Sequence, residues 1–174
     1  MKEIVRLKIR RFSLILMIVF STIGCDQATK IVARDTLRTI GSLSYLGNTI
    51  RLQYAENPGA FLSLGAGLPA TARFLIFTLL AGFFLAILGH RAFYGRAGLP
   101  AILGLALMLG GGVGNLIDRF ARGQVIDFLN VGFGGVRTGI FNIADVAVVA
   151  GLLLIAFDSY MIKDPQTVRA KRRD

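Results

Sequence analysis

Two aspartates, Asp127 and Asp145, lie in the polar stretch between the last two apolar runs of this sequence. Ionisable side chains at a membrane boundary are costly, so they are candidates for function by default. Two carboxylates held a few ångströms apart cannot both ionise, and one proton is then shared between them. The ionised member can take a proton from water while the protonated member polarises a peptide carbonyl. The two aspartates therefore predict aspartic-protease chemistry, provided that their segments meet at one membrane face.

Other catalytic arrangements have less support. The chain has one histidine, His90, and one cysteine, Cys25, so neither Ser–His or Cys–His catalysis nor a zinc cluster is indicated. A cation held by Asp and Asn oxygens is conceivable, since hard cations take oxygen ligands. The carboxylate pair is the simpler interpretation, and we expect neither a metal nor a cofactor.

The composition indicates a membrane protein. Of 174 residues, 54% are hydrophobic and the mean hydropathy is +0.64, which is too apolar for an ordinary soluble domain. The formal net charge is +10, but the basic residues cluster at the two termini. That distribution indicates membrane orientation rather than nucleic-acid binding. We therefore expect one membrane domain over residues 1–162 and no nucleic-acid partner.

Four apolar segments are long enough to cross a ~30 Å hydrocarbon core as helices. The predicted spans are residues 12–33, 70–88, 99–117 and 141–162. An even number of spans places both termini on the same side of the membrane. These segments predict an all-α membrane protein with four transmembrane helices.

The basic residues predict which side of the membrane the termini occupy. Five lie in the first eleven residues, five lie in the tail 163–174, and the short loop after the second span carries Arg91 and Arg96. The positive-inside rule assigns all three regions to the cytoplasm. The longer loops 34–69 and 118–140 then face outward, toward the periplasm in a bacterium.

The outer loops contain patterns typical of β-structure. Residues 49–54, TIRLQY, alternate apolar and polar side chains as a half-buried strand does, and Gly47-Asn48 before them is a turn signal. Residues 128–140 combine four glycines with scattered Val, Phe and Ile, and this segment could also be extended. We expect a small β-sheet region on the outer face.

With this topology, the polar residues near the bilayer fall at one leaflet, apart from Asp158 near the inner end of the fourth span. They are Asp26, Lys30, Asn57, Gly59, Asn115, Asp118, Arg119, Asp127, Asn142 and Asp145. Random placement would divide them between the two faces of the membrane. Their shared position predicts a single site at the outer interface.

Several of these residues also have structural interpretations. Asp26 and Lys30 have the i,i+4 spacing of a helical salt bridge. Asp118 and Arg119 form either an interfacial ion pair or a substrate contact. Four glycines in residues 110–114 favour close packing of helices, since small residues let membrane helices approach.

Two other classes of protein remain as alternatives. Intramembrane acids also mark proton or cation paths in transporters, but such a path should place polar groups along the full depth of the bilayer. The basic start, the first apolar run and the TIGC sequence ending at Cys25 resemble a lipoprotein signal peptide. A tethered soluble domain, however, would not contain three further apolar segments.

Five short sequences, in this order across the four spans, resemble bacterial lipoprotein signal peptidase, also called signal peptidase II. They are DQATK (26–30), NPGAF (57–61), GNLIDR (114–119), VIDF (125–128) and FNIAD (141–145). Each would be weak evidence alone, but five in order are strong, and together they cover nearly the whole chain.

The resemblance implies an aspartic endopeptidase of the bacterial inner membrane that cuts diacylglyceryl-modified prolipoproteins just before the lipidated cysteine. It implies that Asp127 and Asp145 are the catalytic pair. The positions expected to support or line the site are Asp26, Lys30, Asn57, Gly59, Asn115, Asp118, Arg119, Asn142 and Ala144. We expect a monomer whose partners are the lipid-modified precursor and membrane lipid.

Overall fold

The computed structural model describes residues 2–59, 65 and 67–163. Its helices are α1 (Lys2–Ile40), α2 (Ala70–Tyr94), α3 (Leu99–Arg122) and α4 (Ile143–Lys163). Its strands are β1 (Ser42–Tyr45), β2 (Ile50–Asn57), β3 (Val125–Phe133) and β4 (Val136–Arg137). The predicted cytoplasmic tail, apart from its first residue, and part of the predicted outer loop 34–69 lie outside the described residues.

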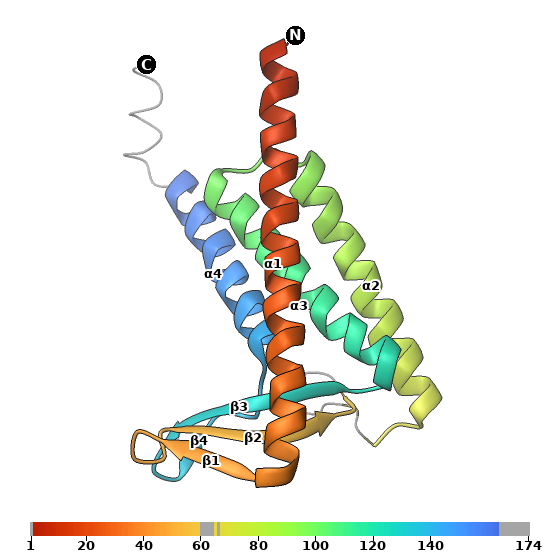
Figure 1. The fold of residues 1–174 in the computed structure, drawn as a ribbon. Helices are drawn as coiled ribbons and strands as arrows, with labels where there is room; N and C mark the ends of the chain where they lie inside the picture. The colour runs from red at the N-terminus through yellow and green to blue at the C-terminus, as the bar shows by residue number, and fades with distance from the viewer. Residues whose placement is uncertain (1, 60–64, 66, 164–174) are drawn as a thin grey trace.

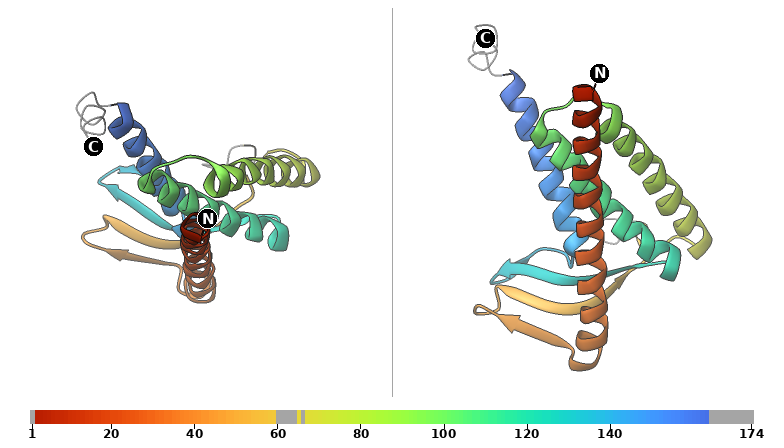
Figure 2. Two further views of the ribbon diagram at one scale, coloured as in Figure 1. Left: turned by 90° about the horizontal axis from the view of Figure 1, so that it is seen from above. Right: turned by 45° about the horizontal axis from the view of Figure 1, so that its top comes forward.

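The four helices form a bundle with the sheet across one end (Figure 1). Helix α1 begins, and α4 ends, at the opposite end of the bundle from the sheet. Helix α3 packs against all three other helices, and the views in Figure 2 show it between them. All four helices are long and apolar enough to cross a membrane. The expected fold class, four transmembrane helices with a small sheet region, is confirmed.

Helices α1, α2 and α3 are longer than the predicted spans. Helix α1 continues to Ile40, seven residues past the predicted end of its span at Ala33. Ala33 and Leu37 are one turn apart and both are buried against Phe128 of the sheet, while Asp35 and Arg38 are exposed. Hydropathy detects only the part of a helix that lies in lipid, so it missed this amphipathic extension.

The sheet is antiparallel, in the order β1-β2-β3-β4. The predicted strand at 49–54 is confirmed from Ile50 onward as part of β2, and the predicted turn joins it to β1. In the register of β2 and β3, Ala55 pairs with Asp127 and Asn57 pairs with Val125. The sheet therefore brings Asn57 beside Asp127, although 70 residues separate them in sequence.

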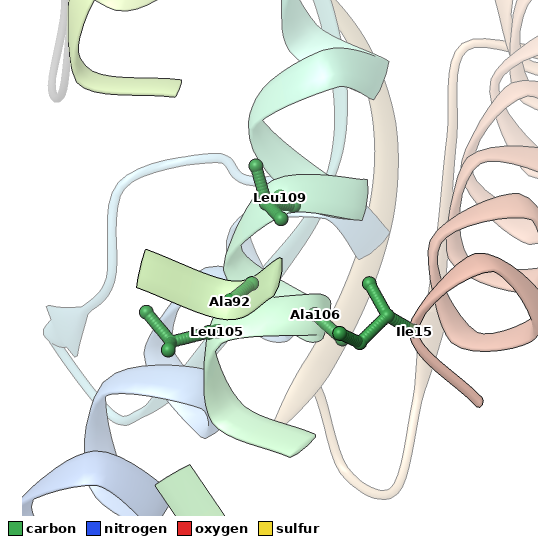
Figure 3. Close-up of a cluster of buried hydrophobic side chains, with 5 residues drawn as sticks. All are labelled: Ile15, Ala92, Leu105, Ala106 and Leu109. Carbon is green, nitrogen blue, oxygen red and sulfur yellow. The ribbon is translucent and has the colours of Figure 1, made fainter. Parts of the chain in front are cut away.

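Apolar side chains fill the bundle toward the end away from the sheet. The buried cluster consists of Ile15, Ala92, Leu105, Ala106 and Leu109 (Figure 3). These side chains come from α1, α2 and α3. The polar residues named above are absent from this cluster, so the interior changes from apolar to polar toward the sheet.

Glycines of α3 permit close contact with its neighbours, as predicted. A Cβ on Gly104 would lie 2.5 Å from the backbone oxygen of Gly151 in α4. A Cβ on Gly110 would lie 2.7 Å from the Cβ of Thr22 in α1. These distances are far below ordinary van der Waals contact, so larger residues would force the helices apart.

Gly114→Ala tests this packing where it touches the polar end of the bundle. A Cβ on Gly114 would lie 2.6 Å from Oδ2 of Asp26. Overpacking of this kind typically costs about 1–3 kcal/mol, and we expect a lower midpoint of thermal unfolding in detergent. The matched control is Gly24→Ala in α1, where nothing lies within 4 Å of the added Cβ. An unchanged midpoint for Gly114→Ala would contradict the packing argument.

Candidate active site

Asp145 is held at the N-terminus of α4 by a reciprocal pair of hydrogen bonds. Its backbone N–H donates to Oδ1 of Asn142 over 3.0 Å. Its Oδ2 accepts from the backbone N–H of Asn142 over 3.1 Å. Asn142 directly precedes the first helical residue, so the two residues form a capping box. Helix capping therefore fixes the rotamer of Asp145.

Asp127 lies near the start of β3 and is held by two amides. Its Oδ2 accepts from Nδ2 of Asn57 over 3.1 Å, and its Oδ1 accepts from Nδ2 of Asn142 over 2.7 Å. Only 3% of Asp127 is exposed. The sheet supplies one amide and the α4 cap supplies the other, so Asp127 is fixed from two sides.

Asn142 connects the two aspartates directly. Its side-chain amide donates to Asp127, and its backbone N–H donates to Asp145. Asn115 of α3 gives a second connection, since it donates to Oδ1 of Asp145 over 2.9 Å and accepts from Asn142 over 3.1 Å. The structure therefore brings the two carboxylates into one hydrogen-bonded unit, as the site hypothesis requires.

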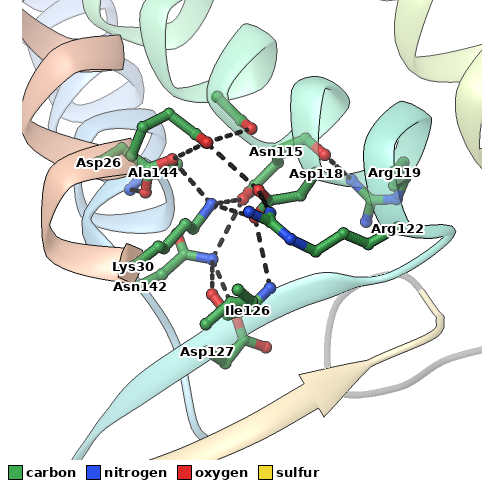
Figure 4. A network of polar contacts seen from close by, with 12 residues as sticks. Asp26, Lys30, Asn115, Asp118, Arg119, Arg122, Ile126, Asp127, Asn142 and Ala144 are labelled. Carbon is green, nitrogen blue, oxygen red and sulfur yellow. Dashed lines mark hydrogen bonds and ion pairs between the residues drawn. The ribbon is translucent and has the colours of Figure 1, made fainter. Parts of the chain in front are cut away.

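A buried ammonium lies beside this unit (Figure 4). Lys30 Nζ contacts Oδ2 of Asp26 at 2.7 Å, Oδ2 of Asp118 at 2.8 Å and Oδ1 of Asn115 at 2.8 Å. Lys30, Asp26 and Asp118 all have 0% exposure. Three acceptors satisfy the three N–H groups of the ammonium. The ammonium therefore fills the space between Asp26 and Asp118 in which a metal cation would otherwise bind. The predicted i,i+4 bridge between Asp26 and Lys30 is confirmed.

These ion pairs position the backbone around both aspartates. Asp26 Oδ1 accepts from the backbone N–H of Ala144, one residue before Asp145, over 3.0 Å. Asp118 Oδ2 accepts from the backbone N–H of Ile126, one residue before Asp127, over 3.3 Å. Each supporting acid thus holds the segment that carries one member of the pair.

The alternative in which Asp118 and Arg119 form an ion pair is wrong. Asp118 pairs with Lys30 and, over 2.6 Å, with Nη1 of Arg122, one helical turn further on. Consecutive helical residues point about 100° apart, whereas residues four apart share a face. Arg119 instead donates to the backbone oxygens of Asn115, over 3.3 Å, and Gly59, over 3.2 Å.

Asn57 and Gly59 form the turn expected from their sequence. The N–H of Gly59 donates to Oδ1 of Asn57 over 3.0 Å. This contact fixes the Asn57 amide so that its Nδ2 faces Asp127. Because Arg119 binds the carbonyl of Gly59, the turn is also tied to α3.

The network includes two side chains that were not predicted. Gln27 Nε2 donates to the backbone oxygen of Gly114 over 3.1 Å and to Oδ1 of Asp118 over 3.3 Å. Arg122 neutralises Asp118 from the solvent side. The i,i+4 spacing of Asp118 and Arg122 was a usable signal for the second residue. The contact of Gln27 depends on the packing of α1 on α3 and had no local signal.

A cavity of about 750 Å³ opens beside the two carboxylates. Its polar lining includes Asp127, Asp145, Asn57, Asn115 and Arg119. The rest of its lining is mainly apolar and includes residues of α2, α3 and α4. The cavity therefore joins the acid pair to surfaces suited to hydrocarbon.

Burial raises the pKa of Asp127 to about 6, and the nearby charge of Asp145 acts in the same direction. Hydrogen bonds from Asn57 and Asn142 oppose the rise. A carboxyl group with a pKa near 6 can hold a proton close to neutral pH, as a general acid must. The arrangement can therefore hold one proton between two carboxylates and deliver it to a bound group.

The raised pKa of Asp127 predicts a pH-dependent stability. Folding favours the protonated form of Asp127. Its contribution to the free energy of unfolding is therefore complete below the ordinary aspartate pKa of 3.8 and is lost as pH rises through about 6. Asp127→Asn cannot ionise, and its thermal midpoint should fall less than that of the parent between pH 5 and pH 8. The control is Asp35→Asn, whose carboxylate is 59% exposed. Equal pH dependence in Asp127→Asn and the parent would refute the raised pKa.

The fold and the site together define a multi-pass membrane protein with a polar, acid-containing site at one end of its helix bundle. A family model described as signal peptidase (SPase) II matches residues 18–161. The chain therefore belongs to the signal peptidase II family, which makes it a membrane peptidase.

Individual relatives agree with this assignment. The chain is 36% identical over 137 residues to a protein of Syntrophus aciditrophicus named lipoprotein signal peptidase, covering 76% of this chain and 83% of the relative. It is 32% identical over 173 residues to a protein of the same name from Mycobacterium tuberculosis, covering 95% and 80%. A bacterial membrane enzyme solved by the in meso method at 2.3 Å has the same fold, with a TM-score of 0.73, 24% identity, and coverage of 88% and 93%.

Proposed function

We propose that this peptidase is an aspartic endopeptidase that removes signal peptides from diacylglyceryl-modified prolipoproteins. The observation that carries the proposal is the hydrogen-bonded unit of Asp127, Asn142 and Asp145 at the edge of a largely apolar cavity. Two carboxylates held in one unit can share a proton, and the cavity can accept a substrate that carries lipid.

In this proposal the two carboxylates have complementary roles. Asp127 carries the proton, since its pKa is raised to about 6, and hydrogen-bonds the carbonyl oxygen of the scissile peptide. Asp145 takes a proton from a water molecule, whose oxygen attacks the carbonyl carbon. The tetrahedral intermediate then collapses with proton transfer to the leaving amine. Asn57, Asn115 and Asn142 hold the two carboxylates in place throughout.

The location of the cavity favours cleavage just before the lipidated cysteine. Residues of α4 that follow Asp145, including Val146, Val149 and Leu153, line its apolar part. Acyl chains attached to the substrate cysteine would remain along this surface, within the hydrocarbon. The peptide bond preceding that cysteine would then lie next to the carboxylates.

We further propose that the chain is monomeric in the bacterial inner membrane with both termini in the cytoplasm. The loop charges support this orientation through the positive-inside rule. Since the sheet and the acid pair are at the end of the bundle opposite the start of α1, they would face the periplasm. Lipid-modified precursors also present their cleavage sites at that face.

The two alternative classes receive less support from the described residues. The apolar cluster around Leu105 and Leu109 separates the polar network from the other end of the bundle, which does not suit a transport path. Cys25 lies within the uninterrupted helix α1, which also carries Asp26 and Lys30 of the network. Removing the residues before Cys25 would take away Ile15, the contribution of α1 to the buried apolar cluster.

The test of substrate class is the lipid dependence of cleavage. One precursor peptide is prepared with and without the diacylglyceryl group on its cysteine, and both are incubated with purified enzyme in the same detergent. We expect cleavage of the modified form only, with the new N-terminus at the modified cysteine. Equal cleavage of the unmodified peptide would argue against a lipid-recognising cavity. It would not bear on the aspartic mechanism, which the Asp127→Asn and Asp145→Asn variants test.

A further inference from the structure

A second cavity, of about 930 Å³, lies at the end of the bundle opposite the carboxylate pair. It is formed by α1 residues between Lys8 and Phe12 and by the residues that end α2 and lead to α3. The proposed peptidase chemistry makes no use of this cavity.

The charge of the lining is entirely positive. Lys8, Arg11 and Arg96 contribute to it, and none of its nine residues, all within the described part of the chain, is acidic. Arg11 is partly committed, since it donates from Nε to the backbone oxygen of Ala92 over 2.9 Å. Lys8 and Arg96 are exposed and form no ion pair with any described residue. Two cationic groups therefore remain available for an anion.

The same cavity has a substantial aromatic surface. Phe12 of α1 and Phe93 of α2 lie with ring centroids 5.2 Å apart, and Tyr94 is 79% exposed beside them. Phe12 is also 53% exposed. Aromatic side chains with one apolar side and one side near water are typical of the membrane interface. The lining thus combines basic groups with apolar surface at the end of the spans.

We propose that this cavity binds one anionic phospholipid, with the phosphate on Lys8 and Arg96 and the start of the acyl chains on Phe12 and Phe93. A free phosphate would use the charges but leave the rings exposed, and a neutral apolar ligand would leave the charges unused. An anionic lipid matches both parts of the lining. Basic pockets at the ends of membrane helices bind such head groups by the same chemistry.

Native mass spectrometry of the purified full-length protein can test this assignment. Phosphatidylglycerol and phosphatidylcholine with identical acyl chains are titrated into the parent and into Lys8→Gln/Arg96→Gln. We expect the parent to prefer phosphatidylglycerol, and the double variant to bind it about thirtyfold more weakly, as expected for two basic contacts with an anionic lipid. The matched control is Arg6→Gln/Arg10→Gln, which removes two exposed charges from α1, the helix that carries Lys8, but outside the cavity.

The control and a competition experiment decide between the possible outcomes. Retained binding in Arg6→Gln/Arg10→Gln supports a specific site, whereas an equal loss there means general attraction to basic charge and overturns the proposal. Equal binding of the two lipids by the parent also overturns it. Complete displacement of phosphatidylglycerol by inorganic phosphate would indicate an ion site without a lipid-binding surface, and this too overturns the proposal. Thermal unfolding of each variant checks that all compared proteins are folded.

Discussion

Asp127→Asn and Asp145→Asn are each expected to reduce cleavage of a lipid-modified precursor at least about a thousandfold while the protein stays folded. In the proposed mechanism each carboxylate has a separate role in proton transfer, and an amide cannot exchange that proton. An amide has the shape of the carboxylate, so it disturbs packing little. Its NH2 group cannot accept a hydrogen bond, so each variant loses one of the bonds donated by Asn57, Asn115 or Asn142. The measurement is turnover per folded molecule, normalised by thermal unfolding in detergent.

The two losses should not add. Residues that act as one catalytic unit are strongly non-additive, so the double variant should be about as inactive as either single variant. The pH profile of the parent should be bell-shaped and belong to the pair. Asp35→Asn, an exposed change on α1, should retain full activity. Substantial turnover by either single variant would refute the aspartic mechanism and direct attention to Asp26 and Asp118.

Lys30→Met is expected to be the most destabilising single change in the network. The substitution leaves Asp26 without a cationic partner and Asp118 with only Arg122, although both carboxylates have 0% exposure. Breaking a buried ion pair by removing one partner typically costs about 3–5 kcal/mol. We expect a low yield of folded protein and a large fall in its thermal midpoint.

A matched control separates burial from the loss of a positive charge. Arg34→Met, one turn along α1, removes a cation that pairs with exposed Asp35, and it should leave the midpoint almost unchanged. Adding Asp26→Asn to Lys30→Met should recover part of the lost stability, because one uncompensated carboxylate is then neutralised. Equal effects of Lys30→Met and Arg34→Met would show that the network does not support the fold.

The sequence predicted the four-helix architecture and the grouping of polar residues well, since both follow from strong local signals. Apolar length marks helices that cross a membrane, and basic loops mark one end of the bundle. The spacing of Asp26 and Lys30 also predicted their salt bridge correctly. All eleven predicted site residues belong to one connected network of hydrogen bonds and ion pairs.

The missed features depend on contacts between distant segments or on a cap. The short strand β1 has little pattern of its own and pairs with β2 because the turn after it brings the strands together. The predicted fourth span began at residue 141, but α4 begins at Ile143, so Asn142 lies outside the helix as its cap. The pattern of Asn142 followed three residues later by Asp145 was a local signal for this cap.

The length of α1 fixes the distance between the active-site carboxylates and the hydrocarbon core of the membrane. Its 39 residues extend about 58 Å at 1.5 Å per residue, nearly twice the hydrocarbon thickness. The same continuous helix packs against α3 within the bundle and places Lys30 beside Asp26. Near its end, Leu37 packs against the sheet. In the proposed function, the height of the carboxylates above the hydrocarbon is therefore set by a helix, not by a loop. A precursor would be selected by where its lipid anchor holds the peptide bond, with little need to read the neighbouring side chains.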